Sequence, residues 1–286
     1  MDTVLVTGGT GHLGRDIVAN LKEAGFRVRV IARKPGEDPD VEWIRGDLAT
    51  GEGIAGSASG ARAIVNAATY SPIAVRGMRP IDLFRTPSAV DLDGTRRLMD
   101  EAARVGAGQF LHISIVGIDD APLPYARLKL ETERAVRASS IPWTVARAAP
   151  FFYLIERTFA GLLKAPIWPL PARTPFQPVD SRDFAAYLVD AVGRNEQGTL
   201  REFAGPEILT IGDVAEQFQA SRGISRRIIN TPLPGPVARA IRSLFPVAAS
   251  NAVRGQTTWR DWLKGREVDV SSADDRHAAS NSRVRA

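Results

Sequence analysis

Cysteine is absent from the 286 residues of this chain, which excludes disulfide bonds, thiolate catalysis and cysteine metal ligands. Histidine is almost as scarce. His12, His112 and His277 stand far apart, with no carboxylates at ligand spacing around them. We therefore expect no zinc or iron site.

Long apolar runs are also missing. Charge or proline interrupts the longest apolar stretches within about ten residues, whereas a membrane-spanning helix needs about 20. The first residues form a strand pattern and lack the basic, apolar and small-residue regions of a secretory signal. These observations predict a cytoplasmic protein with no membrane partner.

No basic stripe accompanies the formal net charge of +5, because Asp and Glu are interleaved with Arg and Lys nearly everywhere. This mixture is typical of a solvated surface. No segment resembles a nucleic-acid recognition helix, so we expect no nucleic-acid partner. The expected partner is a small-molecule substrate, and the expected assembly is a monomer or a homodimer.

The segment TVLVTGGTGHLG, from Thr3 to Gly14, carries the strongest pattern that is present. Gly8 opens a turn after an apolar strand, Gly11 leaves room for a pyrophosphate, and Gly14 lets the following helix pack on the strand. The unpaired N–H groups and positive dipole at the helix start favour phosphate. The turn thus predicts dinucleotide contacts at Gly8, Thr10, Gly11, His12, Leu13 and Gly14.

Apolar strands alternate with helical patterns through the first half of the chain. This alternation predicts an α/β fold of the Rossmann type, a doubly wound parallel sheet with helices on both faces. The strands are expected near Thr3, Phe26, Val41, Ala63, Gln109 and Trp143, and the helices near His12, Asp91 and Tyr125.

After Arg147 the composition shifts toward aromatic residues and proline. We expect residues 1–150 to form the NAD(P)-binding domain. Residues 151–269 are expected to form a small C-terminal substrate lobe, partly interleaved with the sheet. Further helices are predicted over 181–192, 211–222 and 259–263, and residues 270–286 are predicted to be disordered.

Between Ser71 and Ala89 three prolines interrupt the pattern. In a doubly wound sheet, ligands bind beyond the carboxyl ends of the strands, where this loop lies. It is therefore either a lid over the substrate or a surface excursion.

Tyr125 and Lys129 stand four residues apart at the start of a helical stretch, so their side chains share one face. An ammonium beside a phenol stabilises the phenolate, which makes the tyrosine a usable acid or base near neutral pH. Ser114 ends the strand QFLHIS and is placed to hydrogen-bond a substrate oxygen. Taken alone, the Tyr-Lys spacing is more typical of an exposed surface pair.

The order of these motifs resembles that of short-chain dehydrogenases/reductases. More closely, the chain resembles the atypical, NmrA-like branch of that superfamily, from about Val4 to Trp262. The segments that carry the resemblance are TGGTGHLG, RGDL, NAAT, DLDGTRRLMDEA, HISIVGID and FQPVDSRDFAAYLV.

The resemblance implies an NAD(P) cofactor and a catalytic group of Ser114, Tyr125 and Lys129, with Lys129 also holding the nicotinamide ribose. Family members place an asparagine on the fourth helix to hold a relay water, whereas this chain has Asp91 there. An ionised carboxylate accepts hydrogen bonds but donates none. The resemblance also assigns adenine and adenosine contacts to Asp47, Leu48, Asn66, Ala67 and Ala68.

Arg33 distinguishes between the two dinucleotides. An NAD site usually carries Asp or Glu after the second strand, roughly 20 residues beyond the glycines. Here Ala32, Arg33 and Lys34 occupy that region. A guanidinium binds a 2′-phosphate that an acidic side chain would repel, so we expect NADP rather than NAD, although a basic surface turn would look the same.

These features predict an NADP-dependent oxidoreductase that moves a hydride between nicotinamide and a small carbonyl or alcohol, with Tyr125 and Lys129 as the acid-base pair. The alternatives are a nucleotide-sugar epimerase or dehydratase and a non-catalytic NADP(H) sensor that binds a partner protein. An apolar substrate pocket is expected after the sixth strand, unless the same aromatics form the core between the lobes. Its candidate walls are Phe151, Phe152, Tyr153, Trp168 and Phe176.

Overall fold

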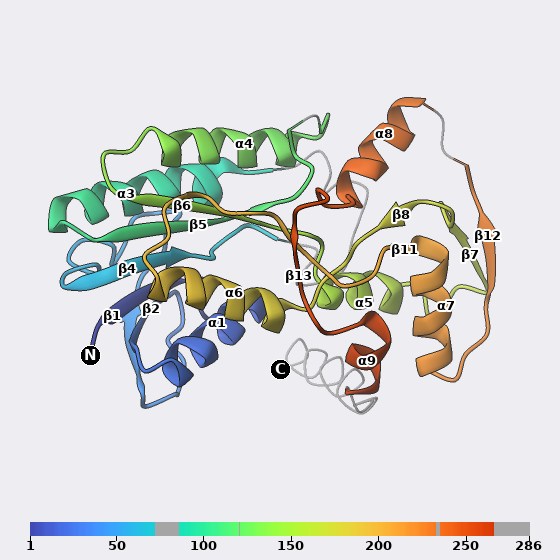
Figure 1. Cartoon of the computed structure of the whole chain (residues 1–286), viewed down its shortest axis with the longest axis horizontal. Coiled ribbons are helices and arrows are strands. Elements are labelled where there is room, and N and C mark those ends of the chain that lie inside the picture. Colours follow the sequence, from blue (N-terminus) through green and yellow to red (C-terminus); the bar gives the residue numbers. More distant parts are fainter. Residues whose placement is uncertain (72–85, 120, 233–234, 266–286) are drawn as a thin grey trace, which may run out of the picture.

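The computed structural model describes residues 1–71, 86–119, 121–232 and 235–265. This part of the chain contains a nine-stranded sheet in the order β13-β10-β6-β5-β4-β1-β2-β3, with β9 beside β6 (Figure 1). All its strand pairs are parallel. The strands are β1 (Thr3–Thr7), β2 (Arg27–Ala32), β3 (Val41–Arg45), β4 (Ala61–Asn66), β5 (Gln109–Ile115), β6 (Trp143–Ala148), β9 (Gly198–Thr199), β10 (Phe203–Ala204) and β13 (Val253–Arg254).

Helices cover both faces of the sheet, as Figure 1 shows. On one face lie α1 (His12–Glu23) and α6 (Ser181–Gly193). On the other lie η2 (Ala89–Asp93), a turn of π-helix that runs directly into α3 (Gly94–Val105), and α4 (Pro124–Arg137).

The central strands carry apolar residues on both faces because both faces are buried. In β1, Val4 and Val6 belong to the apolar cluster that contains α1 and α6 residues, whereas Leu5 belongs to the cluster on the α3 and α4 side. The same alternation holds in β5, where Phe110 faces α3 and α4 and Leu111 faces α1 and α6. This register determines which side each polar residue at a strand end must take.

A smaller lobe lies beyond one end of the sheet (Figure 1). Its interior is a third apolar cluster, which is rich in aromatic rings. Two short strand pairs belong to this region, β8 with β11 in antiparallel and β7 with β12 in parallel orientation. Its elements are α5 (Phe152–Ala160), β7 (Ile167–Leu170), β8 (Pro175–Phe176), β11 (Leu209–Thr210), α7 (Ile211–Ser221), β12 (Arg227–Asn230), α8 (Gly235–Leu244) and α9 (Trp259–Lys264).

The six strands and three helices expected in the first half of the chain are present, and the Rossmann-type fold is confirmed. Helices α6, α7 and α9 also lie where the sequence predicts them, but α5, α8 and the short strands of the second half were missed. Most of the predicted loop (72–85) and the predicted disordered tail lie outside the described residues. The split at residue 150 stays a prediction, since α6, β9, β10 and β13 return to the large sheet.

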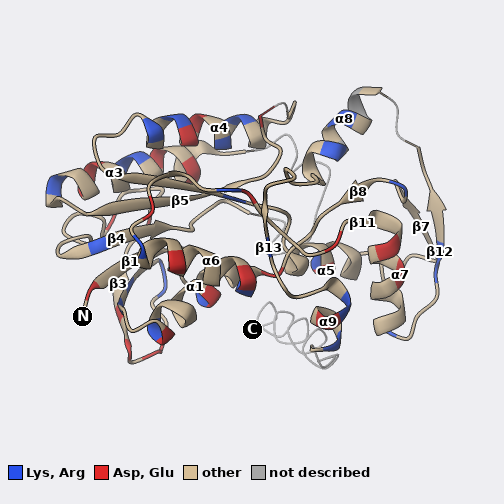
Figure 2. Ribbon diagram, in the orientation of Figure 1, with Lys and Arg blue, Asp and Glu red and all other residues tan. Residues whose placement is uncertain are grey.

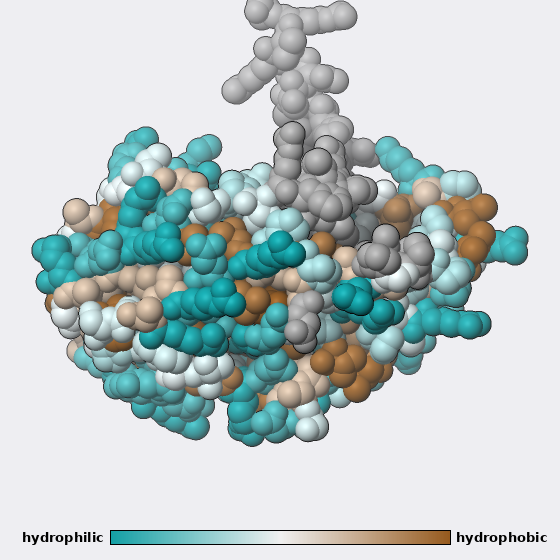
Figure 3. All heavy atoms as spheres, turned by 90° about the horizontal axis from the view of Figure 1, so that it is seen from above, coloured by the Kyte–Doolittle hydropathy of each residue, from teal (hydrophilic) through white to brown (hydrophobic). Residues whose placement is uncertain are grey.

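Acidic and basic residues alternate along the outer helices, most visibly on α4 (Figure 2). Seen from the α4 side, the surface is mainly hydrophilic with scattered apolar patches (Figure 3). Exposed apolar residues of the small lobe include Ile167 and Ile229 on the β7–β12 pair. Among the described residues, no helix has the length and apolar character needed to cross a membrane.

Candidate active site

The glycines of the turn after β1 have different structural tasks. Gly8 adopts a left-handed conformation (φ +71°), and an added Cβ would lie 2.8 Å from the backbone of Ala67 and Ala68. A Cβ on Gly14 would collide with the carbonyl oxygen of Gly8, so only glycine lets α1 start directly against the turn. Gly11 is exposed, and its added Cβ would meet the Gly8 oxygen at 3.1 Å. The surface at Gly11 is therefore the part of the turn that is open to a ligand.

The amino-terminal end of α1 suits an anion. In this described helix, Gly11 provides no side-chain cap and the first turn holds no acidic residue. Thr10 is exposed and its carbonyl accepts a hydrogen bond from Arg15 Nη1 (2.7 Å), while the Leu13 side chain is buried in the core. Backbone N–H groups are thus the hydrogen-bond donors left for a phosphate, and the helix dipole adds electrostatic attraction. The turn therefore fits a dinucleotide.

The neighbouring strand ends complete this surface. Because β2 pairs in parallel with β1, both strands end on the same side of the sheet, and Arg33 and Lys34 follow β2 beside the glycine turn. Both are exposed, and Arg33 forms no hydrogen bond or ion pair with the described residues. Asp47 and Leu48 follow β3, the next strand along, with Asp47 half-buried and Leu48 buried. The carboxyl ends of these strands thus offer a guanidinium that has no partner among the described residues, and it fits a 2′-phosphate.

A row of buried polar side chains crosses the carboxyl ends of β1, β4 and β5 on the α3 and α4 side. Thr7 Oγ1 donates to Asn66 Oδ1 (2.7 Å), and Asn66 Nδ2 donates to Thr95 Oγ1 (2.8 Å) and lies 3.4 Å from His112 Nδ1. Ser114 comes two residues after His112, on the same face of β5. Each of these side chains is at most 1% exposed. The Asn66 amide is therefore engaged inside the protein and is not presented to a ligand.

Asp91 and Lys129 form a buried ion pair above this row. Lys129 Nζ lies 3.0 Å from Asp91 Oδ1, with side-chain exposures of 4% and 1%. Asp91 Oδ1 also accepts from the Thr69 hydroxyl (2.6 Å), and Oδ2 accepts from the Tyr70 N–H (2.8 Å). The π-helical turn of η2 thus brings a carboxylate, and not the asparagine of the family pattern, into contact with the lysine.

The charges of this pair determine the protonation states around it. Burial disfavours the charged form of Asp91, but Lys129 and the hydrogen bonds from Thr69 and Tyr70 outweigh burial and lower the Asp91 pKa. Burial also disfavours the Lys129 ammonium, yet the charges of Tyr125 and Asp91 raise its pKa overall. Both groups are therefore ionised at neutral pH.

Tyr125 is the second residue of α4, and Lys129 Nζ lies 5.8 Å from the centre of its ring. A second phenol, Tyr153 at the start of α5, stacks on the His12 ring with 4.1 Å between centroids. Burial and the neighbouring Tyr125 raise the pKa of Tyr153. The first turns of α1, α4 and α5 thus meet at this site.

An ion-pair cluster around Arg147, behind Tyr125, was not predicted from the sequence. Arg147, near the end of β6, donates from Nε and Nη2 to both carboxylate oxygens of Glu133 on α4 (2.8 Å each). The same guanidinium holds Asp119, which follows β5, at 2.6 Å and 3.0 Å. Arg147 therefore ties together the strand end and helix that carry Ser114 and Tyr125. An arginine inside the otherwise apolar strand TVARA was the signal.

The structure does not bring all predicted pocket walls to this site. Phe152 (1% exposed) packs on Trp259 and Trp262, and Trp168 (0% exposed) stacks on Phe159 inside the third apolar cluster. These are the contacts of lobe core residues, the alternative that the sequence left open. Tyr153 stacks on His12, the first residue of α1, and on Phe151, which also packs on Phe184 of α6.

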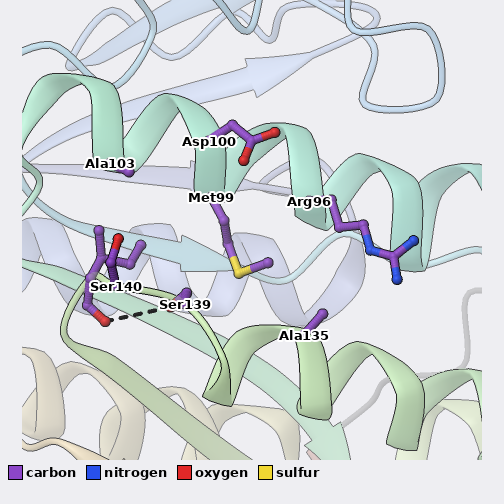
Figure 4. Close-up of a pocket in the computed structure, with 8 residues that line it drawn as sticks. Arg96, Met99, Asp100, Ala103, Ala135, Ser139 and Ser140 are labelled. Carbon is purple, nitrogen blue, oxygen red and sulfur yellow. Dashed lines mark hydrogen bonds between the residues drawn. The ribbon is translucent and has the colours of Figure 1, made fainter.

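A hollow of about 260 Å³ lies elsewhere, between α3 and α4 (Figure 4). Its lining includes Ala103 and Ala135 from the later turns of these helices and Ile141 just before β6. The hollow therefore lies near the amino ends of the strands, whereas the site described above lies at their carboxyl ends. Among the described residues, no group of three or more His, Asp or Glu is arranged to hold a metal ion.

Comparisons with known proteins agree with this geometry. A family model described as NAD(P)H-binding matches residues 8–154. A reductase of (4-alkanoyl-5-oxo-2,5-dihydrofuran-3-yl)methyl phosphate from Streptomyces griseus is 28% identical over 91% of this chain and 96% of its own length. The photosystem II assembly factor Ycf39 of Cyanophora paradoxa is 25% identical over 81% of this chain and 72% of its own length.

Among solved structures, the Escherichia coli NADPH-dependent quinone oxidoreductase QOR2 in complex with NADPH has the same fold. Its TM-score is 0.73 at 16% identity, over 92% of this chain and 99% of that chain. At this identity the likeness concerns the fold alone.

Proposed function

Because the chain belongs to the NAD(P)H-binding family and has the fold of short-chain dehydrogenases/reductases, we propose that it is an NADP-dependent oxidoreductase acting on a small carbonyl or alcohol. The bound nicotinamide would supply or receive the hydride. The single observation that carries the proposal is the buried Asp91–Lys129 ion pair beside Tyr125. Cofactor binding alone requires no such pair next to a phenol.

Tyr125 is the proton donor in the reducing direction. As negative charge develops on the substrate oxygen, Tyr125 gives up its hydroxyl proton, and the Lys129 ammonium stabilises the resulting phenolate. In the oxidising direction the same phenolate takes the proton from the alcohol.

Asp91 positions Lys129 and takes no proton itself. Its two oxygens already accept from Thr69, Tyr70 and Lys129, and its lowered pKa keeps it ionised. An ionised carboxylate has no proton to donate, so a relay through Asp91 of the kind built around the family asparagine is not part of this mechanism.

Ser114 donates a hydrogen bond to the substrate oxygen and so polarises the carbonyl. The glycine turn and α1 hold the pyrophosphate, and Arg33 selects the 2′-phosphate of NADP. Phe151 and Tyr153 form the apolar side of the substrate site next to His12. The reductase from Streptomyces griseus, similar along nearly the whole chain, supports reduction over epimerisation.

A cofactor-binding assembly or sensor protein is the second candidate. Its specific support is the likeness to the assembly factor Ycf39 across 81% of this chain. Under this alternative the chain binds NADP(H) but reduces no carbonyl compound.

Replacing Tyr125 by phenylalanine tests the proposal. With NADPH and a panel of aldehydes, ketones, quinones and unsaturated lactones, Tyr125→Phe should lower turnover by roughly 10²–10⁴-fold and leave NADPH affinity unchanged. Tyr153→Phe is the matched control, because it removes a phenol hydroxyl from the same site without a lysine on its own helix, and it should retain turnover within about tenfold.

Equal turnover by wild type and Tyr125→Phe contradicts the assigned role. A wild type that binds NADPH tightly but is inert across the panel favours the assembly or sensor candidate.

A further inference from the structure

The hydrogen-bond directions in the buried polar row can be assigned from the geometry. Thr95 Oγ1 donates its only hydrogen to the Asp91 carbonyl oxygen, so toward Asn66 it can only accept. The NH₂ group of Asn66 must therefore face Thr95, and its oxygen faces the Thr7 hydroxyl. This arrangement excludes a flipped amide.

The orientation of Asn66 then determines the tautomer of His112. The Asn66 NH₂ group lies 3.4 Å from His112 Nδ1 and can only donate, so Nδ1 is an acceptor without hydrogen. Burial and the charge of Lys129 lower the His112 pKa to about 3, and the ring is neutral. A neutral imidazole carries one hydrogen, which must lie on Nε2.

Two buried polar atoms remain without a hydrogen-bond partner among the described residues on this side of β5. They are His112 Nε2, an N–H donor, and Ser114 Oγ, two residues further along the same strand face. Both residues are 1% exposed. A buried polar atom without a partner destabilises the fold, and proteins commonly satisfy such atoms with internal water.

We propose that His112 is a positioning residue: its Nε2–H donates to one buried water molecule, which in turn donates to Ser114 Oγ. The inference rests on the proposed function, because it assigns the direction of the Ser114 hydroxyl. With its oxygen accepting from the water, Ser114 directs its own hydrogen at the substrate oxygen.

The donors then form one directed series from β1 to the substrate. Thr7 donates to Asn66, Asn66 to His112, His112 to the water, the water to Ser114, and Ser114 to the substrate oxygen. Hydrogen bonds in such a chain polarise one another, so the series strengthens the last donor. It also prevents the Ser114 hydroxyl from rotating away from the substrate.

The first arm of the test needs no substrate. In protein labelled with ¹⁵N-histidine, the His112 resonances, identified by their loss in His112→Phe, should report hydrogen on Nε2 from about pH 5 to 8. A high-resolution crystal structure should show a water within hydrogen-bond distance of both Nε2 and Ser114 Oγ. Hydrogen on Nδ1, or no ordered water between the two side chains, overturns the proposal.

The second arm measures the coupling between the two residues with 4-nitrobenzaldehyde and NADPH. His112→Phe should lower kcat by about 5-fold to 10-fold, the rate equivalent of one hydrogen bond, and His112→Gln, which keeps a donor near Nε2, should restore most of it. In a Ser114→Ala background, His112→Phe should cause no further loss. An additive loss overturns the positioning role.

The buried hydroxyl of Thr144 on β6 provides the matched control. It bonds to Gln109 and the Glu196 carbonyl, away from this series, so Thr144→Val should lower thermal stability without changing kcat. If wild type reduces no carbonyl compound, the proposed function fails, while the tautomer and the water still decide whether His112 and Ser114 share a water site.

Discussion

Replacing Asp91 by asparagine removes one charge from the buried ion pair and preserves the shape of the side chain. Lys129 and Asp91 are 4% and 1% exposed at their side chains, so the ammonium would be left buried without its counter-ion. Removing one partner of a buried pair costs about 3–5 kcal/mol. That is a large part of a typical unfolding free energy of about 5–15 kcal/mol.

Asparagine cannot compensate, because both oxygens of Asp91 accept hydrogen bonds. Oδ1 faces the Thr69 hydroxyl and Lys129, and Oδ2 faces the Tyr70 N–H. An asparagine has one oxygen and one NH₂ group, so either amide orientation sets a donor against a donor. The full cost is therefore expected.

Urea unfolding followed by the fluorescence of the five tryptophans measures this cost. Asp91→Asn should lose about 3–5 kcal/mol of unfolding free energy, and its Tm should fall by about 6–20 °C. The double variant Asp91→Asn/Lys129→Met removes the orphan charge and should be more stable than the single variant. A loss below about 1 kcal/mol in Asp91→Asn, or no recovery in the double variant, refutes the reasoning.

Three further predictions concern the cofactor edge and the polar row. Arg33→Ala should weaken NADPH binding by about 1.5–3 kcal/mol and leave NADH unaffected in fluorescence titrations, with Arg27→Ala at the other end of β2 as control; equal affinities of wild type for both cofactors contradict the NADP assignment. Gly11→Val should abolish cofactor binding in a protein with unchanged circular dichroism, whereas Gly14→Ala should lose about 3 kcal/mol of stability or more; tight binding by folded Gly11→Val would disprove the phosphate site. Folding lowers the pKa of His112 from 6.5 to about 3. Between these two pH values the unfolded chain binds a proton that the folded chain does not bind, so the free energy of unfolding decreases as the pH is lowered. From about pH 7 to 5, wild type should lose about 2 kcal/mol more than His112→Gln in urea unfolding, and parallel curves would show that the imidazole is not buried as a neutral group.

The glycine turn and the strand alternation are local properties, and the sequence was sufficient to predict them. The start of α1 and the apolar strands depend on residues within about a dozen positions of each other. The sequence therefore determined the Rossmann-type fold and the glycine turn after β1. It also placed Tyr125 and Lys129 on one helix face, because that requires only helical spacing.

The role of Asp91 required the tertiary structure. The sequence marked this position as a departure from the family asparagine, but only the π-helical turn of η2 brings Thr69, Tyr70 and Lys129 around its carboxylate. The aromatic residues after β6 are a similar case. Hydrophobicity alone does not tell a pocket wall from a core residue, and the partners that bury Phe152 come from α9, about a hundred residues away.

The polar row shows the same limit most clearly. Thr7 and Asn66 are 59 positions apart, and Asn66 and His112 are 46 apart, yet they are neighbours because β1, β4 and β5 pair in parallel with fixed register. In the sequence Thr7 and Asn66 are polar residues that end largely apolar strands, and His112 lies inside the strand QFLHISI. Sequence determined which residues end the strands, and the register of the sheet decided that their hydrogen bonds form one series, because side chains of adjacent strands meet only when both strands present the same face at the same level.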